Sequence, residues 1–302
     1  MKRILLFLLA AGLVVSCKKD NQLTEDATAA IPEVPATFGQ NVLIEQFTST
    51  FNGRCPVTDF QLDSLMALAP DRIVGVNIHV NDSLSAPQVT NATTGANLIN
   101  DLYNPLGFIP AGMVNRNITS PLTDLFSSDI PIKAGVAIGY NPRCGLAIDA
   151  TDAGGGYLTL SVHVGFSADM PGSYRLHVYL VENAFSSLDS IYDQFNDFSQ
   201  FGGPTPDPNS TLYDLPYEIN GYVHNHVLRK IISTGGLNGE AINSNLAVAG
   251  NDIVSSYNVN LSGYSVANCS IVAFVDKYGS TGTSHRVENV RSVKIGQVAS
   301  WN

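Results

Sequence analysis

The chain has 302 residues, and its acidic residues outnumber its basic ones by 26 to 16, a formal net charge of −10. Hydrophobic residues make up 44% of the chain, so a substantial core is expected, and the length favours two domains. An acidic chain without a basic stripe is not suited to nucleic acid, so no nucleic-acid partner is expected.

The first residues have the pattern of an export signal. A charged start, "MKR", precedes the apolar run "ILLFLLAAGLVV", which is shorter than the roughly 20 residues of a membrane-spanning helix. The run ends in "VVSC", and a small residue before Cys17 is typical of a lipoprotein signal. The sequence therefore predicts a signal peptide over 1–16, lipidation of Cys17 and a flexible tether over 17–37. A secretory signal with a chance cysteine is the alternative.

Lys18 bears on which membrane receives the protein. Lipoproteins that stay at the inner membrane resemble one another in having aspartate at this place, directly after the lipidated cysteine. Lysine there favours the outer membrane, facing either the periplasm or the exterior. The predicted membrane contact is the lipid alone.

Residues 38–131 alternate strand and helix patterns. "NVLIEQFT" and "RIVGVNIHV" are apolar runs typical of buried strands, and "IPAGMVNR" predicts a third strand that starts at a proline. Between the first two, "CPVTDFQLDSLMALA" has helical spacing, with Pro56 suited to the first turn. "TTGANLINDLY" predicts a short helix. This order indicates a small α/β layer domain.

Residues 132–302 change to alternating apolar and polar residues, beginning with "IKAGVAIGY" and ending with "HRVENVRSVKIG". About seven such strands, separated by turn signals, predict an antiparallel β-sandwich. The segment 183–220 interrupts them with four aromatic or aliphatic residues at helical spacing: Phe185, Leu188, Tyr192 and Phe195. A helix is expected here, either covering an end or edge of the sandwich or presenting an aromatic binding surface.

Five stretches in this order resemble the Omp28-related outer membrane lipoproteins: "VLIEQFTSTFNGRCP", "RIVGVNIHV", "GFIPAGMVNR", "HNHVLRK" and "CSIVAFV". They cover most of the chain after the tether. The resemblance implies a thioredoxin-like domain over 38–131 followed by an immunoglobulin-like β-sandwich over 132–302.

The first stretch often carries a Cys-x-x-Cys pair in this family. Here Asn52 stands at the first cysteine and Cys55 at the second, so the attacking thiol is missing and the resolving thiol is kept. Gln46 stands where thioredoxins have a buried acid, and Pro110 matches their cis-proline. The sequence predicts a degenerate redox loop without disulfide reductase activity, although Arg54 and the helix start could stabilise a Cys55 thiolate.

Strand ends of one sheet edge should bring further side chains to this loop. Phe51, Arg54 and His79 are therefore a candidate binding patch, and a hydrogen-bonded structural role for His79 is the alternative. Glu45, next to Gln46, is expected to point to the opposite face of its strand.

Three cysteines remain after Cys17, an odd number for an oxidising compartment. Cys144 and Cys269 both begin predicted strands of the sandwich and are candidates for a disulfide. Two free buried thiols fit the sequence equally well.

His224 and His226 alternate in "YVHNHVLRK", which on a strand places both imidazoles on one face. Such a pair suits a transition metal if a third ligand, such as Asp214, completes it. A structural role together with Arg229 is the alternative.

These observations favour an outer-membrane-anchored lipoprotein that acts as a non-enzymatic binding or assembly module, with no cofactor and with an unnamed protein or ligand as partner. The first alternative is a thiol-disulfide or monothiol exchange protein that uses Cys55. The second is a metal-binding protein that uses His224 and His226.

Overall fold

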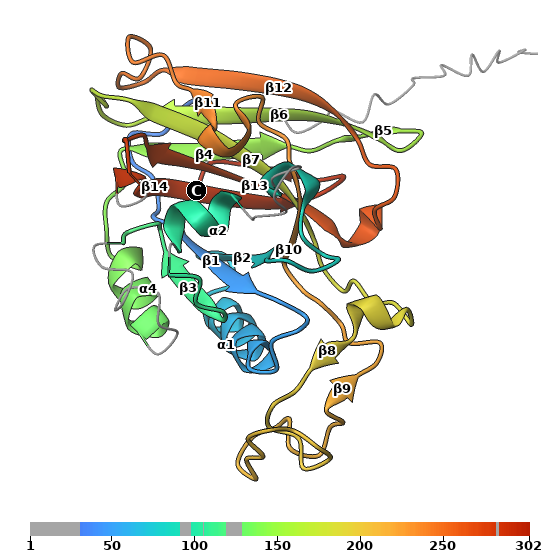
Figure 1. Ribbon diagram of the computed structural model, residues 1–302. Helices are drawn as coiled ribbons and strands as arrows, with labels where there is room; N and C mark the ends of the chain where they lie inside the picture. Colours follow the sequence, from blue (N-terminus) through green and yellow to red (C-terminus); the bar gives the residue numbers. More distant parts are fainter. Residues whose placement is uncertain (1–30, 91–97, 105, 119–128, 282–283) are drawn as a thin grey trace, which may run out of the picture. The chain divides into compact units, whose positions relative to one another are not determined.

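The computed structural model describes residues 31–90, 98–104, 106–118, 129–281 and 284–302 (Figure 1). The predicted signal peptide, Cys17 and most of the predicted tether lie outside the described residues. Residues 31–302 form one compact unit that is mostly β-structure, with few helices and several antiparallel pairings. No helix of the described ranges is long and apolar enough to cross a membrane.

Two large sheets make up the unit. The first has eight strands, in the order β14 (Val287–Lys294), β13 (Cys269–Lys277), β7 (Tyr174–Glu182), β10 (Val227–Ile231), β2 (Ile73–His79), β1 (Val42–Thr48) and β3 (Ala111–Val114), with β11 (Glu240–Ala241) on β7. The second has five, in the order β12 (Asp252–Asn260), β6 (Tyr157–Phe166), β4 (Cys144–Asp149) and β15 (Val298–Ala299), with β5 (Asp152–Gly154) on β6.

The eight-stranded sheet crosses the predicted boundary at residue 131. Strands β1 and β2 run parallel, joined by helix α1 (Cys55–Leu68), and β3 pairs antiparallel with the other edge of β1. Strand β2 also pairs with β10, at Asn77 and Val227. Residues 38–131 and 132–302, predicted as two domains, thus contribute to one sheet, and their division stays a prediction.

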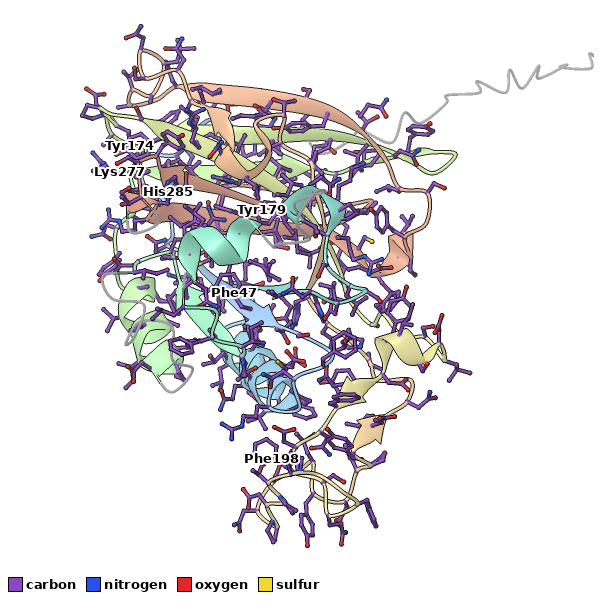
Figure 2. The ribbon with its side chains drawn as sticks, viewed as in Figure 1. Phe47, Tyr174, Tyr179, Phe198, Lys277 and His285 are labelled. Carbon is purple, nitrogen blue, oxygen red and sulfur yellow. The ribbon has the colours of Figure 1, made fainter. Side chains whose placement is uncertain are left out.

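Alternation along β7 explains how one strand serves two cores. Val178 and Leu180 face the five-stranded sheet and pack in the core of the sandwich. Tyr179 and Val181 face the other way, into a second core that continues over β1 and β2 and includes Phe47. Figure 2 labels Tyr179 and Phe47, which lie on this shared face. Because both faces are covered, nearly every residue of β7 is buried.

Helix α4 (Ile130–Ile138) occupies most of a segment that was predicted as a strand, "IKAGVAIGY". Its buried residues, Ile130, Ala134 and Ala137, recur at helical spacing and pack with β1 and α1 in a third core. The strand prediction was wrong because a short apolar run fits both periods, and only the packing partner decides between them. Helix α2 (Leu98–Tyr103) falls within the predicted short helix.

Residues 183–226, here called the strap, connect β7 to β10 and run beside α1 (Figure 1). The predicted helix is absent from them. In its place are a 3₁₀ turn, η3 (Ser190–Tyr192), and a small sheet of β8 (Gln194–Phe195) and β9 (Glu218–Ile219). The remaining short 3₁₀ turns are η1 (Pro87–Val89), η4 (Gly236–Asn238) and η5 (Val266–Asn268).

Polar side chains of the strap explain why no helix forms there. Asn196 donates from Nδ2 to the carbonyl of Leu212 at 2.8 Å, and Ser199 donates from Oγ to the carbonyl of Leu215 at 2.6 Å. Such side chains satisfy the backbone without a helical ladder and favour turns. The aromatic spacing that suggested a helix therefore has no helical counterpart.

The second core encloses a charged cluster. The Arg116 guanidinium donates two hydrogen bonds of 2.7 Å to Glu45 and one of 3.1 Å to Asp276. It also donates to the hydroxyls of Tyr103 and Tyr179, each at 2.9 Å. All five side chains are buried, and Glu45 points to the face expected from strand alternation. Burial raises the pKa of Asp276, but His177, His285 and Arg116 together hold it well below its usual range.

Candidate functional site

Asn52 lies in the turn between β1 and α1, at the position that the sequence assigns to a missing first cysteine. The Asn52 Nδ2 donates to the carbonyl of Ile109 at 2.6 Å, and its Oδ1 accepts from the Arg54 N–H at 3.0 Å. The Ile109–Pro110 peptide bond is cis. Asn52 thus ties the loop to the segment just before β3.

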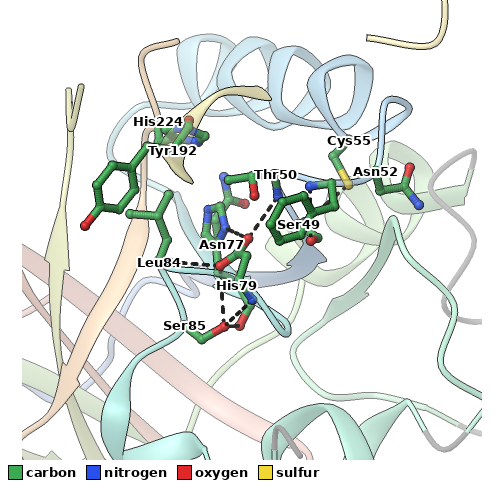
Figure 3. A network of polar contacts seen from close by, with 12 residues as sticks. Ser49, Thr50, Asn52, Cys55, Asn77, His79, Leu84, Ser85, Tyr192 and His224 are labelled. Atoms are coloured by element: carbon green, nitrogen blue, oxygen red, sulfur yellow. Dashed lines mark hydrogen bonds and ion pairs between the residues drawn. The ribbon is translucent and has the colours of Figure 1, made fainter. Parts of the chain in front are cut away.

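Cys55 begins α1 and is fully buried. Its Sγ accepts a hydrogen bond from the Ser49 N–H at 3.4 Å (Figure 3). Burial, with a further contribution from Asp59, raises the pKa of the Cys55 thiol to about 12. The thiol is therefore protonated at neutral pH and is a poor nucleophile.

Arg54 does not stabilise a Cys55 thiolate, contrary to one expectation from the sequence. Its side chain is 63% exposed and lies 3.8 Å from the Asp197 carboxylate of the strap. The reason is that Arg54 precedes the helix and points outward, whereas Cys55 enters the core beneath it.

The strap closes over the loop 49–55. Gln194 Nε2 lies within hydrogen-bonding distance of three loop carbonyls, those of Ser49, Thr50 and Asn52, at 3.2 to 3.4 Å. The Phe195 N–H donates to the carbonyl of Thr50 at 2.9 Å, and the Asp197 N–H donates to that of Gly53 at 3.0 Å. The loop therefore has its backbone acceptors occupied by the strap and not by solvent.

Gly53 makes this close approach possible. A Cβ built on Gly53 would overlap the backbone nitrogen and the carboxylate of Asp197. Only glycine fits at this position while the strap stays in place.

The three residues of the candidate patch, Phe51, Arg54 and His79, do not lie together on the surface. Phe51 is 56% exposed and packs edge-on against Phe195 of the strap, with ring centroids 6.1 Å apart. His79 is buried, and its Nδ1 lies 2.7 Å from the carboxylate of Asp82. Two of the three side chains thus lie outside, while the third belongs to an internal network (Figure 3).

Asp82 joins that network to the loop. Its carboxylate accepts the Thr50 N–H at 2.9 Å as well as contacting His79. Burial raises the pKa of Asp82, but the charge of His79 and these hydrogen bonds outweigh burial, so the pKa is lowered overall. This pattern is typical of a carboxylate that organises a turn.

His224 and His226 do not share a face, which corrects the prediction of a paired site. His226 has a positive φ of 56°, so the strand alternation breaks between them. His224 is buried, with Nε2 2.9 Å from the carbonyl of Tyr192, and burial lowers its pKa to about 4. His226 Nε2 instead lies 2.8 Å from Asp63 on α1. Among the described residues no group of three or more potential metal ligands comes together.

The disulfide predicted between Cys144 and Cys269 is not formed, and both thiols are free and buried. They begin strands of different sheets, β4 and β13, and both pack in the sandwich core. Burial raises the pKa of the Cys269 thiol to about 12 and that of Cys144 further. The alternative of two free buried thiols is the observed one.

Asp59 is the residue that sequence reasoning missed. It lies one helical turn after Cys55, and its Oδ1 accepts from Gln46 Nε2 at 2.9 Å. Burial raises the pKa of Asp59 from 3.8 to about 6, with the charge of His79 opposing this effect. The sequence could have indicated this residue, because Asp59 lies four residues after Cys55 and this spacing places both side chains on one face of a helix.

Residues 96–299 match the family model described as outer membrane protein Omp28. The chain belongs to the Omp28 family. Membership confirms the resemblance drawn from the sequence motifs and places the protein at the outer membrane, as expected. Among curated proteins no match is found.

Solved structures show how far the fold of this Omp28-family chain is shared. HBP35 of Porphyromonas gingivalis has a TM-score of 0.63 at 19% identity, over 87% of this chain and 78% of that one. A protein of Agrobacterium tumefaciens has a TM-score of 0.51 at 12% identity, over 86% of this chain and 96% of that one. At these identities the two likenesses show the fold alone.

A domain of the outer membrane lipoprotein Omp28 from Porphyromonas gingivalis is also among the solved structures that match. It shares 20% identity over 52% of this chain and 90% of that one, with a TM-score of 0.30.

Proposed function

We propose that this Omp28-family protein is a lipid-anchored, non-enzymatic binding or assembly module of the outer membrane. In this proposal residues 38–131 are thioredoxin-like, with a redox loop that has lost its first cysteine, and residues 132–302 are an immunoglobulin-like sandwich. The β1–α1–β2 unit with antiparallel β3, and the cis bond at Pro110, support the first assignment. The two-sheet core supports the second.

The burial of Cys55 beneath the strap is the observation that carries the non-enzymatic role. Disulfide exchange needs a thiolate that can reach a substrate sulfur in line. Cys55 is fully buried, its pKa is raised to about 12, and Asn52 supplies no second thiol. A loop whose backbone is hydrogen-bonded to the strap is suited to a structural or binding role.

An insulin reduction assay tests the absence of exchange chemistry. The natural protein should show no catalysis and no dithiol redox midpoint, whereas Asn52→Cys should form a Cys-x-x-Cys disulfide with a measurable midpoint. In parallel, an alkylating reagent should modify Cys55 only after unfolding. Catalytic insulin reduction by the natural protein near the rate of a thioredoxin would overturn the proposal in favour of an exchange protein that uses Cys55.

The lipid anchor is proposed at Cys17, which lies outside the described residues. Its support is the short apolar run that ends in "VVSC". Cys17→Ala should release the protein from membranes or leave the signal uncleaved, because one lipid is the whole anchor proposed. Unchanged membrane fractionation of a mature-sized Cys17→Ala protein would contradict this assignment.

A further inference from the structure

Strand β12 is the outermost strand of the five-stranded sheet and lies along the top of Figure 1. All nine of its residues pair with β6 in an unbroken antiparallel register, from Asp252 with Gly165 to Asn260 with Tyr157. At the opposite edge of the same sheet, β15 has only two residues. Strand β12 is therefore the long edge of this sheet.

The backbone of β12 alternates between groups that face β6 and groups that face outward. The Leu261 N–H, directly after the strand, donates to the carbonyl of Gly156 at 2.7 Å, so the odd-numbered residues are bonded to β6. The N–H and C=O groups of the even-numbered residues point away from the sheet, and they include those of Val254, Ser256 and Asn258. None of these three residues has a backbone hydrogen bond to another part of the described chain.

Strand β12 lacks the features that usually protect a sheet edge. Proline, lysine, a bulge or a covering segment normally prevents exposed backbone groups from pairing with another chain. The sequence "DIVSSYNVN" contains neither proline nor lysine, and its register has no bulge. The edge strand β14 of the other sheet is covered, because the carbonyls of Glu288 and Val290 accept from the side chains of Gln40 and Asn302 at 3.0 and 3.1 Å. The contrast indicates that β12 is open to a partner strand.

The sequence of β12 suits pairing with a second copy of itself. Full antiparallel overlap places Ser256 at the centre and Ile253 opposite Val259 of the second copy. Ile253 packs against the sandwich core but is only partly buried, so this apolar neighbour would cover it. The one charged residue, Asp252, then lies opposite Asn260. The two Asp252 residues are roughly 27 Å apart along the strands, well beyond a Debye length of about 8 Å, so their charges do not oppose the pairing.

The first described residues lie on the outer face of this sheet. Trp301 Nε1 donates to the carbonyl of Pro32 at 2.8 Å, and a Cβ built on Gly165 would lie 3.0 to 3.1 Å from the Trp301 ring and the Val34 side chain. Gly165 faces outward, because the even-numbered residues of β6 fill the sandwich core, and it pairs with Asp252. The predicted tether therefore joins the body beside β12, on the outer face of the sheet.

The symmetry of such a pair agrees with anchoring in one membrane. Two copies that pair antiparallel and continue one sheet are related by a twofold axis normal to the sheet, so both outer faces lie on the same side. Both tethers then leave from that side. The residues between Cys17 and Pro32 span at most roughly 50 Å, so the two lipids proposed at Cys17 can enter one membrane. A shared membrane also raises the local concentration of copies, so a modest affinity is enough.

We propose that β12 is a homodimer interface, in which two copies pair antiparallel along Asp252–Asn260 about Ser256 and join their five-stranded sheets. The pairing names a partner for the proposed assembly role and in that respect rests on it. Because the pair occupies β12 in both copies and β15 is too short to pair onward, the assembly closes at two copies.

Cysteine cross-linking of the full lipidated chain in the outer-membrane fraction tests the pairing. In Ser256→Cys the two added thiols belong to a hydrogen-bonded pair with Cα atoms about 5.5 Å apart, a separation that a disulfide can span. Thr159→Cys is the matched control, because it is exposed on the same outer face but lies one strand further from the interface. Oxidation should give a covalent dimer of Ser256→Cys alone. The natural protein is the blank, because its described cysteines are all buried.

A charge at the centre of the interface tests its contribution to dimer stability. In Ser256→Lys two ammonium groups lie opposite each other, and the dissociation constant of the dimer should rise about fivefold. Thr159→Lys adds the same charge to the same face away from the centre and should leave the constant unchanged. Sedimentation of the detergent-solubilised full chain measures both. Both residues are exposed, so the variants should keep the fold, and circular dichroism checks this.

Four results would overturn the proposal. They are a monomer at every concentration, equal cross-linking of the two cysteine variants, a dimer that Ser256→Lys leaves unchanged, and a cross-link of Ser256→Cys to a different protein in place of a second copy. Insulin reduction and membrane fractionation of the same sample test the proposed function separately. A protein that is anchored, redox-silent and monomeric loses the pairing alone, whereas reductase activity removes the non-enzymatic role.

Discussion

Glu45 and Gln46 are neighbours on β1, and their side chains enter opposite faces of the same sheet. On the face of Glu45, two carboxylates are buried around Arg116, with contacts of 2.7 and 3.1 Å. On the face of Gln46, Asp59 is held by neutral donors, the amides of Gln46 and Asn77. The pKa of Asp276 is lowered on the first face, and that of Asp59 is raised to about 6 on the second.

The difference teaches what a buried carboxylate requires. Burial raises the pKa of both Asp276 and Asp59, so desolvation by itself does not distinguish them. What differs is the partner: a fixed guanidinium and two histidines contact Asp276, whereas amide and phenol donors contact Asp59. At Asp276 the effects of His177, His285 and Arg116 together outweigh burial, whereas at Asp59 those of His79 and Tyr222 do not.

Removing the Arg116 guanidinium should have the largest effect on stability. Arg116→Met leaves Glu45 and Asp276 buried without their shared partner, and the expected loss is about 3–5 kcal/mol in the free energy of unfolding. Urea denaturation at pH 7 measures it. Arg286→Met is the control, because its ion pair with Glu288 at 3.1 Å is half exposed and should contribute less than about 1 kcal/mol. Equal losses in the two variants would contradict this account of the cluster.

Asp59→Asn should change how the stability of the protein depends on pH. Because burial raises the pKa of Asp59 from 3.8 to about 6, the folded state keeps a proton in this window that the unfolded state has lost. Stability from this group is therefore present at pH 4 and is lost as the pH rises to about 6. At about 1.4 kcal/mol for each pH unit between the two pKa values, the loss is at most about 3 kcal/mol.

The asparagine variant has no such proton, so it should escape the loss and exceed the natural protein in stability at pH 7. Asp276→Asn should behave in the opposite way. Its lowered pKa stabilises the fold above pH 4, and this contribution is lost as the pH falls further. Urea denaturation from pH 2 to 7 measures both, because the contribution of Asp276 is lost only below pH 4. Parallel pH profiles for the natural protein and Asp59→Asn would show that Asp59 does not titrate in this way.

A smaller effect on stability is expected from Gly53→Ala, which disturbs the contact between the loop and the strap. In Gly53→Ala the added Cβ meets Asp197, so the strap must shift, at a cost of about 1–3 kcal/mol. Hydrogen exchange of the Phe195 and Asp197 N–H groups, which bond to the loop, should become faster. Gly135→Ala is the matched control, because it has open space on α4 and should stabilise by about 0.5–1 kcal/mol. Unchanged exchange in Gly53→Ala would mean that the strap does not depend on this contact.

Local pattern determined a large part of this protein from its sequence. The alternation of β6, β7, β12 and β13, the helix that starts at Cys55, and the loop with asparagine in the first cysteine position all follow from neighbours in the chain. Motifs in a fixed order also identified the family. Each of these signals spans a few residues, and short-range sterics and hydrophobic period decide them.

Tertiary structure decided what contacts cross between distant segments. The pairing of Val227 with Asn77 makes one sheet of two predicted domains, and packing on β1 makes α4 a helix where alternation predicted a strand. The strap brings Gln194 and Asp197 onto the loop more than 140 residues earlier and occupies its backbone carbonyls. No local period encodes such contacts, because their free energy comes from which surfaces meet, and that is settled only when the whole chain is folded.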